Sequence, residues 1–289
     1  MGDSVVKVLV TGNGTGGSWS IRGCQLGEAI GATVRAKAID IGPFDLAVVV
    51  KRAKPDLVAR IHQAQVPLIY DVVDAWPQPE GNRWDRATCV SWLTDQVRRM
   101  RPAGIVAATQ AMADDCKQFG VPVLALPHHV RPGIKRNPIR ETVQTVGYEG
   151  GLDYIAQWRH VIEAECSRRG WRFVVNPENL ADLDIVLALR DSDGYAPRHW
   201  KSAVKLANAQ GSGTPFIGSP EAGYMEQSVG VERFVETAEA LRLAFNALTP
   251  QAERRRVSGW MLSVAPTLEQ VAAKYAEWLK SCFETARNC

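Results

Sequence analysis

Short apolar runs alternate with amphipathic runs along almost the whole of this 289-residue chain. Residues 5–10, 46–50 and 66–72 have the composition of buried strands, and apolar residues at helical spacing lie between such runs. Parallel strands need crossover segments between them, and those crossovers are usually helices. The alternation therefore predicts an α/β protein whose parallel sheets are covered by helices.

The sequence predicts the individual elements as follows. The expected strands are residues 5–10, 33–39, 46–50, 66–72, 103–108, 121–126, 142–148, 171–175, 184–189, 215–218 and 231–235. The expected helices are residues 18–30, 55–64, 85–100, 110–119, 152–169, 199–210, a helix ending near Leu248, and an amphipathic tail over 266–286.

The strand and helix rhythm breaks once, over residues 127–138, which hold three prolines and little periodicity. We interpret this segment as a linker between two domains. The first domain is then 1–130 and the second is 139–265, and the chain is long enough to give each a hydrophobic core.

Charge is unevenly distributed. Residues 1–140 carry 18 Lys and Arg against 12 Asp and Glu, whereas the remainder carries 16 against 19. The basic first part favours an anionic partner such as nucleic acid, phospholipid or an acidic polymer, and a chance imbalance on a solvated surface is the alternative.

No apolar run approaches the roughly 18 residues of a membrane span, and the N-terminus runs directly into a strand without a secretory signal. The six cysteines are scattered and form no CxxC pair. These features predict a cytoplasmic protein without integral membrane association, disulfide framework or zinc site.

Two segments predict anion binding. Residues 190–226 run from a strand through a polar loop and a helix to a Gly-rich turn, and Arg198, Lys201 and Lys205 would share one helix face, which either binds a diphosphate or is simply solvated. Gly12 to Gly17 matches the GxGxxG pattern of dinucleotide-binding proteins. Asp40 lies 28 residues beyond Gly12 instead of about 20, which weakens the NAD alternative.

Together these segments resemble the GT-B-fold glycosyltransferases of the family 4 type, and a compact, phage-type member in particular. The resemblance implies two Rossmann-like domains facing across a cleft, with a C-terminal helix over 266–289 crossing back to the first domain. It implies a nucleotide-sugar donor, in most such families a UDP-sugar, and neither a cofactor nor a metal. The donor-binding residues that it implies are Gly16, Gly17, Arg22, His128, Gly150, Arg198, Lys201, Lys205, Gly213, Thr214 and Glu226.

The sequence departs from the family pattern where retaining members carry two glutamates. Trp200 and Asn208 stand at those positions, so the stereochemistry of transfer is open between inversion and retention. Asp191-Ser192-Asp193 matches the DxD metal motif of a different glycosyltransferase fold, but short acidic matches arise often by chance.

The first domain would present the acceptor. Asp74 and Asp71 follow a strand and are candidates for a general base, or alternatively cap local backbone. Trp76 and Trp84 are candidates for stacking on the acceptor, and Arg98 and Arg99 for contacting it. The leading acceptor is a hydroxymethyl-type base in phage DNA, which would place the protein in the host cytoplasm. A lipid, polysaccharide or small-molecule acceptor, an NAD-linked enzyme and a non-catalytic sugar-nucleotide-binding protein are the alternatives. The oligomeric state is open.

Overall fold

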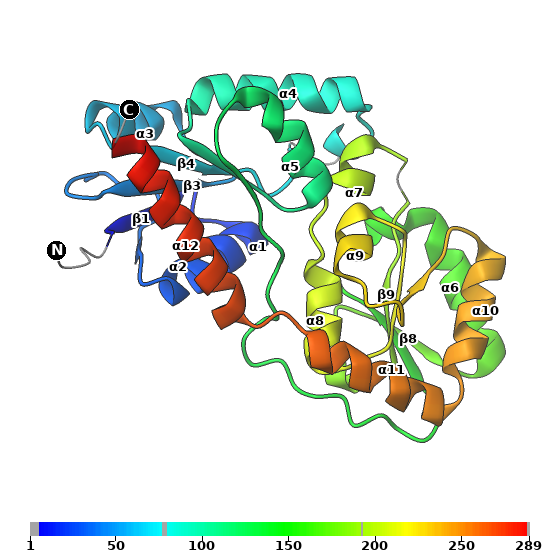
Figure 1. Cartoon of the computed structure of the whole chain (residues 1–289). Coiled ribbons are helices and arrows are strands. Elements are labelled where there is room, and N and C mark those ends of the chain that lie inside the picture. The colour runs from blue at the N-terminus through cyan, green and yellow to red at the C-terminus, as the bar shows by residue number, and fades with distance from the viewer. Residues whose placement is uncertain (1–5, 77–79, 192, 288–289) are drawn as a thin grey trace. The chain divides into compact units, whose positions relative to one another are not determined.

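The computed structural model describes residues 6–76, 80–191 and 193–287. The chain divides into two compact units (Figure 1). Unit 1 comprises Met1–Pro127, Gly194–Ser202 and Leu268–Cys289, and unit 2 comprises His128–Asp193 and Ala203–Thr267. The sequence placed residues 194–202 in the second domain, but they belong to unit 1.

Unit 1 is built on a six-stranded sheet in the order β2-β1-β3-β4-β5-β6, and every neighbouring pair is parallel. Its strands are β1 (Val8–Gly12), β2 (Thr33–Val34), β3 (Leu46–Val50), β4 (Leu68–Asp71), β5 (Gly104–Ala107) and β6 (Val123–Ala125).

The helices of unit 1 cover both faces of this sheet. They are α1 (Gly16–Ser18), the π-helical η1 (Trp19–Gln25), α2 (Leu26–Ala29), α3 (Pro55–Gln63), η2 (Glu80–Asn82), α4 (Arg86–Met100), α5 (Gln110–Cys116), η3 (Lys117–Phe119), α7 (Tyr195–His199) and α12 (Leu268–Arg287).

Strand β3 shows why this sheet is buried on both sides. All five of its residues are buried, and they alternate between two hydrophobic clusters. Ala47 and Val49 pack with α3, α4 and α5, whereas Leu46, Val48 and Val50 pack with α2 and α12. A continuous apolar run is the pattern expected of a parallel strand between two helical layers. Helix α12, red in Figure 1, completes the second layer beside α2.

Unit 2 contains a five-stranded parallel sheet in the order β11-β10-β9-β7-β8. Its strands are β7 (Thr145–Tyr148), β8 (Arg172–Val175), β9 (Ile185–Ala188), β10 (Phe216–Gly218) and β11 (Arg233–Phe234). Its helices are η4 (Leu152–Ile155), α6 (Ala156–Arg169), η5 (Leu180–Asp182), α8 (Val204–Ser212), α9 (Ala222–Gln227), α10 (Ala238–Leu248) and α11 (Gln251–Val264).

Most of the predicted elements are present, with some differences. The strand predicted over 33–39 contains only Thr33–Val34, and α9 and α11 were not predicted. The single helix predicted over 199–210 is wrong, because the chain leaves helical geometry between α7 and α8. No helix among the described residues is long and apolar enough to cross a membrane.

Candidate functional site

The loops that follow β1, β3 and β4 meet at one edge of the first sheet, because parallel strands share their carboxyl end. Two of these loops line a pocket of about 260 Å³, which we call the glycine-loop pocket. Its lining residues are Asn13, Gly14, Thr15, Gly16, Gly17, Ser18, Trp19, Val50, Lys51 and Arg52.

The glycines shape this pocket through their backbone. Gly14 and Gly16 have φ values of 77° and 81°, which side chains rarely allow. A Cβ at Gly14 would lie 2.3 Å from the Cβ of Ala36, whereas a Cβ at Gly16 or Gly17 would meet nothing within 4 Å. The loop is therefore tight on its Gly14 side and open at Gly16 and Gly17.

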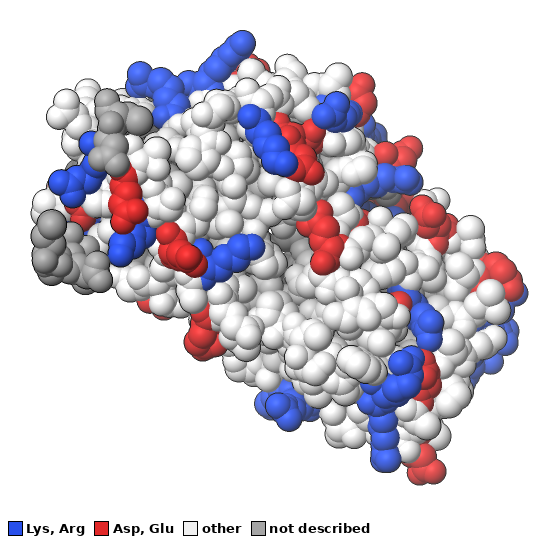
Figure 2. Space-filling view, viewed as in Figure 1, with Lys and Arg blue, Asp and Glu red and all other residues white. Residues whose placement is uncertain are grey.

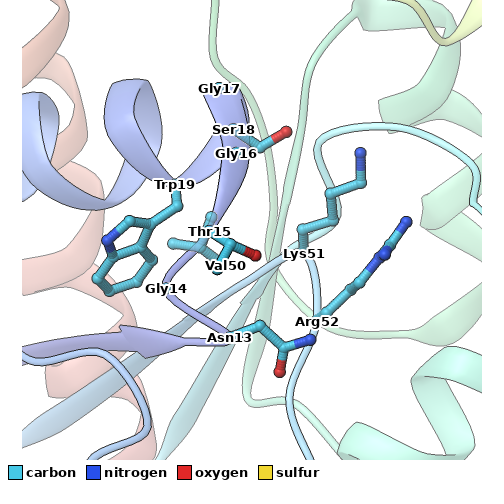
Figure 3. A pocket seen from close by; sticks show the side chains of 10 residues that line it. All are labelled: Asn13, Gly14, Thr15, Gly16, Gly17, Ser18, Trp19, Val50, Lys51 and Arg52. Atoms are coloured by element: carbon cyan, nitrogen blue, oxygen red, sulfur yellow. The ribbon is translucent and has the colours of Figure 1, made fainter.

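Lysine and arginine side chains form the other wall. Figure 3 shows Lys51 and Arg52 extending on the side of the loop that faces away from the Trp19 indole. The Arg52 guanidinium lies 4.7 Å from the centre of the Trp76 ring, a cation–π geometry. The sequence predicted a role for Trp76 but not for Lys51 or Arg52.

Asp74 joins two lysines that are far apart in sequence. Lys51 Nζ lies 2.5 Å from Asp74 Oδ1, and Lys201 Nζ donates to Asp74 Oδ2 at 3.0 Å. Burial alone would raise the pKa of Asp74, but the ammonium groups of Lys201 and Lys51 outweigh burial and hold that pKa below its ordinary value. Asp74 is therefore an ionised ligand of two ammonium groups, which makes it a weak proton acceptor.

Asp71 and Arg22 lie deeper in unit 1. Their side chains are 1% exposed, and Arg22 Nε is 3.7 Å from Asp71 Oδ2. Arg22 also donates to the carbonyl oxygen of Leu126. Burial raises the pKa of Asp71 despite the neighbouring guanidinium of Arg22. The predictions that Arg22 contacts a phosphate and that Asp71 reaches an acceptor are not supported, because both side chains are enclosed by the protein.

A buried carboxylate helps to attach the segment Gly194–Ser202 to unit 1. Asp115 accepts hydrogen bonds from Tyr195 Oη at 2.7 Å, Trp200 Nε1 at 2.9 Å and Arg86 at 2.8 Å. Trp200 is fully buried. These contacts hold Lys201 beside Asp74 and interrupt the predicted helix.

The prediction that Arg198, Lys201 and Lys205 share one helix face is therefore wrong. Arg198 is exposed on α7 and Lys201 follows that helix, both in unit 1, whereas Lys205 lies in the first turn of α8 in unit 2.

Four tryptophans cluster beside α4 in unit 1. Trp92 has ring centroids 5.7 Å from Trp76, 6.1 Å from Trp84 and 6.4 Å from Trp200. Trp84 and Trp92 line an open hollow of about 510 Å³ together with Ala87, Thr88, Ser91 and Asp95. Two half-buried indoles beside hydroxyl groups offer a stacking surface with hydrogen-bonding groups at its rim.

The carboxyl edge of the second sheet also gathers charged groups. After β9, Arg190 Nε donates to Glu221 Oε1 at 2.8 Å, and its guanidinium lies 5.2 Å from the centre of the Tyr154 ring. Lys205 Nζ lies 4.1 Å from the centre of the Tyr148 ring at the end of β7. A cation in the first turn of α8, next to strand ends, suits an anionic ligand.

Several solved structures resemble this chain over nearly its whole length. The Anabaena protein Alr3699/HepE in complex with UDP and glucose is 13% identical with a TM-score of 0.65, over 96% of this chain and all of that one. Sucrose-phosphate synthase from Thermosynechococcus elongatus (10%, TM-score 0.60, 97% of this chain and all of that one) and a glycosyltransferase from Rickettsia africae (8%, 0.60, 96% and 98%) are also similar. The chain has the GT-B fold. No family model and no curated protein matches the sequence.

Several residues that the GT-B resemblance assigned to the donor have structural roles. The amide of Gly150 donates to Asn176 Oδ1. Gly213 ends α8 with a φ of 69°, and a Cβ there would lie 2.5 Å from Ser258 Oγ. Thr214 is fully buried and donates to the carbonyl oxygen of Leu180. Gly150, Gly213 and Thr214 therefore each serve contacts within the protein, and their assignment to the donor stays a prediction.

The remaining assignments in unit 2 have mixed outcomes. His128 is buried, so the alternative of plain polar surface is wrong, and Glu226 is exposed on α9. Asn208, at one expected glutamate position of the GT-B pattern, is buried and accepts a hydrogen bond from the amide of Arg131. Asp191 accepts hydrogen bonds from the amide and the side chain of Gln157, while Ser192 of the DxD match lies outside the described residues.

The site residues that the sequence missed are Lys51, Arg52, Trp92, Arg190 and Glu221. Lys51, Arg52, Arg190 and Glu221 each follow the carboxyl end of a predicted strand. That position marks ligand contacts in open α/β sheets and was available as a signal. Only Trp92, inside α4, had no such signal.

Proposed function

We propose that this GT-B protein is a glycosyltransferase that uses a nucleotide-sugar donor and needs no resident cofactor or metal. The observation that carries the proposal is the structural likeness over nearly the full length of both chains to Alr3699/HepE, whose structure contains UDP and glucose. Proteins with the same fold catalyse many different reactions, so the proposal of glycosyl transfer must also be supported by the residues of the site.

Unit 2 supplies groups suited to a nucleotide diphosphate. Lys205 offers a cation at the first turn of α8, and Arg190 lies nearby at the carboxyl end of β9, oriented by Glu221. Departure of a nucleoside diphosphate leaves negative charge on its phosphates, and fixed cations stabilise that charge in the transition state. Lys205 therefore keeps the role of a donor-phosphate ligand in this proposal.

Unit 1 supplies the acceptor side. The Trp76, Trp84 and Trp92 rings give a stacking surface, and the glycine-loop pocket lies next to it through the Arg52 and Trp76 contact. Because two lysines bind Asp74, we assign this carboxylate to holding those lysines and not to removing the proton of the acceptor hydroxyl.

For the acceptor we propose a hydroxymethyl-type base in DNA, supported by the basic first 140 residues. Arg98 and Arg99 are weak candidates for DNA contacts, because Arg98 pairs with Asp95 at 3.8 Å and Arg99 donates to Gln96 at 2.7 Å. On the face shown in Figure 2, Lys and Arg side chains are interspersed with Asp and Glu. A base within a duplex would have to be flipped out to react.

A transfer assay tests the donor and the acceptor together. The protein is incubated with hydroxymethylated DNA, unmodified DNA or small sugar acceptors and a panel of nucleotide-sugars, and the products are measured by mass spectrometry. A hexose- or pentose-sized gain on the modified base alone supports DNA as acceptor. Sugar transfer only to other acceptors keeps the glycosyltransferase assignment and removes DNA, and no transfer with any pair counts against both.

A further inference from the structure

The exposed side of α4 carries a hollow whose lining combines aromatic rings with hydroxyl groups and a carboxylate. The lining residues are Trp84, Ala87, Thr88, Ser91, Trp92 and Asp95. These residues recur at helical spacing, so they form one continuous face of α4 and of the turn that leads into it. We call this face the α4 hollow. Its volume of about 510 Å³ lies within the range of about 300–1,000 Å³ that is typical of small-ligand sites.

The rest of unit 1 holds the two indoles of the α4 hollow in place. Trp92 contacts Trp200 with 6.4 Å between their ring centroids, and Trp200 is fully buried. The indole N–H of Trp200 donates to Asp115 at 2.9 Å. The carbonyl oxygen of Trp84 accepts a hydrogen bond from the amide of Tyr195 at 2.7 Å. A ligand would therefore meet rings whose positions are already fixed, which lowers the entropic cost of binding.

The polar groups of the α4 hollow favour a neutral ligand that is rich in hydroxyl groups. Among the described residues that line it, Asp95 supplies one carboxylate, and none is a lysine or an arginine. A carboxylate repels phosphate groups, but it accepts hydrogen bonds from hydroxyl groups. Thr88 and Ser91 add hydroxyl groups that both donate and accept. The indole faces would bury the C–H surface of a ligand whose polar edge meets these groups.

The angle between the two indoles favours a puckered ring over a flat one. The rings of Trp84 and Trp92 are tilted by 48° with their centroids 6.1 Å apart. A nucleobase stacks on a single ring through its flat face. Two tilted rings form a shallow concave surface instead, and a sugar ring, which has C–H bonds on its faces and around its edge, fits such a surface.

We propose that the α4 hollow binds a neutral sugar ring. The two indoles stack on the C–H surface of this ring, and Asp95 and Ser91 bind its hydroxyl groups. Such a site would hold the carbohydrate part of an acceptor or of a glycosylated product. This link to sugar transfer rests on the proposed function, whereas the sugar site itself does not. Every lining residue belongs to unit 1, so the site is complete within that unit.

Saturation-transfer NMR with maltotriose and cellotriose tests the site, because this method detects weak binding. An open site and a small ligand predict a dissociation constant in about the millimolar range. Trp84→Leu keeps an apolar side chain but removes the ring, and it should weaken binding by about tenfold. Trp260→Leu is the matched control, because it removes an indole on α11 that is 57% exposed and does not line the α4 hollow. It should change the affinity less than about twofold.

Two further variants keep the test decisive even if Trp84→Leu folds poorly. Ala87→Met fills the α4 hollow from an exposed helical position where methionine is well tolerated. It should abolish sugar binding and leave the urea midpoint nearly unchanged. Asp95→Ala removes an exposed carboxylate and should weaken sugar binding by about threefold or more, the share of one hydrogen bond. Sugar binding that survives Ala87→Met would overturn the proposal.

Thymidine and the oligomeric state test the other occupants of the α4 hollow. Saturation transfer to thymidine but to neither sugar would identify a base-stacking surface and overturn the proposal. A dimer that Ala87→Met converts to a monomer, together with no sugar binding, would assign the hollow to a second copy of this chain and overturn it too.

The transfer assay relates the sugar site to the proposed function. With Trp84→Leu, a raised KM for the acceptor assigns the site to the acceptor, and an unchanged KM with lost sugar binding assigns it to the product. Sugar binding at the α4 hollow by a protein that transfers no sugar would defeat the proposed function and leave the sugar site standing. Sugar transfer by a protein that binds neither maltotriose nor cellotriose would defeat the sugar site alone.

Discussion

Lys51 and Asp74 are 23 positions apart in the sequence and 2.5 Å apart in the structure, measured from Nζ to Oδ1. Each follows a neighbouring strand of the first sheet, and a left-handed residue stands in each turn. Lys201 approaches the same carboxylate from a segment that unit 1 takes from a much later part of the chain. This cluster joins three segments of unit 1 that are far apart in the sequence, and its role can be tested without knowing the substrate.

Asp74→Asn should destabilise the protein by about 2–3 kcal/mol. Loss of one partner leaves two cations close together. The expected loss of stability is smaller than that for a fully buried ion pair, because these side chains are about 15% exposed. Urea unfolding of the variant and of the exposed-site control Asp153→Asn measures the difference.

The effect of Asp74→Asn should also depend on pH. The pKa of Asp74 is lowered in the folded state, so its contribution to stability is present above the ordinary value of 3.8 and is lost as the pH falls through the folded value. The stability difference between the two proteins should therefore shrink below pH 3.8. A difference that persists unchanged into strong acid would show that the ionised carboxylate is not the cause.

Asp115→Ala should destabilise unit 1 by about 2–4 kcal/mol. The substitution leaves the hydroxyl of Tyr195 and the indole N–H of Trp200 without their acceptor. Asp114→Ala is the matched control, since the neighbouring carboxylate is exposed and has only the surface partners Lys117 and Gln110 among the described residues, and it should leave the urea midpoint nearly unchanged. Equal shifts in the two variants would mean that Asp115 does not anchor the segment Gly194–Ser202.

Thiol reactivity should be low in the native state. Burial raises the pKa of Cys89, Cys166 and Cys282 to about 11 and that of Cys116 to about 12, so these thiols stay protonated and enclosed at pH 8. In a Cys289→Ser variant, which removes the cysteine outside the described residues, Ellman's reagent should label no more than Cys24 rapidly. Urea should expose all five remaining thiols, and rapid labelling of several without urea would contradict this burial.

Lys205→Ala should weaken binding of the nucleotide-sugar by about tenfold or more, because it removes the cation at the first turn of α8. Lys201→Ala should leave donor affinity nearly unchanged, since the ammonium group of Lys201 is already engaged with the carboxylate of Asp74. Calorimetry with the donor measures both. A larger effect of Lys201→Ala than of Lys205→Ala would make Lys201, and not Lys205, the ligand of the donor phosphate.

The sheets were predictable because each strand is encoded by the residues of its own short segment. The residues of β3 and β9 form short apolar runs between polar turns, and the glycine after α5 and η3 ends that helix with a φ of 68°. The break between α7 and α8 was not predictable from the residues nearby. It depends on the contact of Trp200 with Asp115, 85 positions away.

The candidate site was predicted less well than the fold, for a similar reason. The sequence identified Asp74, Lys201 and Trp76 separately, but it could not show that Lys201 binds Asp74 across 127 positions. The helical spacing of Lys201 and Lys205 predicted a shared helix face. Only the tertiary contacts show that these lysines lie on different segments and that their spacing has no structural meaning. Arg22 looked like an exposed first-turn arginine, yet its burial comes from packing with residues far along the chain.

This GT-B chain should bind a nucleotide-sugar, and titration calorimetry with UDP, UDP-glucose, other nucleoside diphosphates and NAD measures that binding. We expect a nucleoside diphosphate or its sugar to bind at one site per chain, also in the presence of a chelator, and Lys205→Ala to weaken this binding. Micromolar binding of NAD together with no binding of any nucleoside diphosphate or nucleotide-sugar would rule out this donor and return the Gly12 to Gly17 turn to a dinucleotide-binding role.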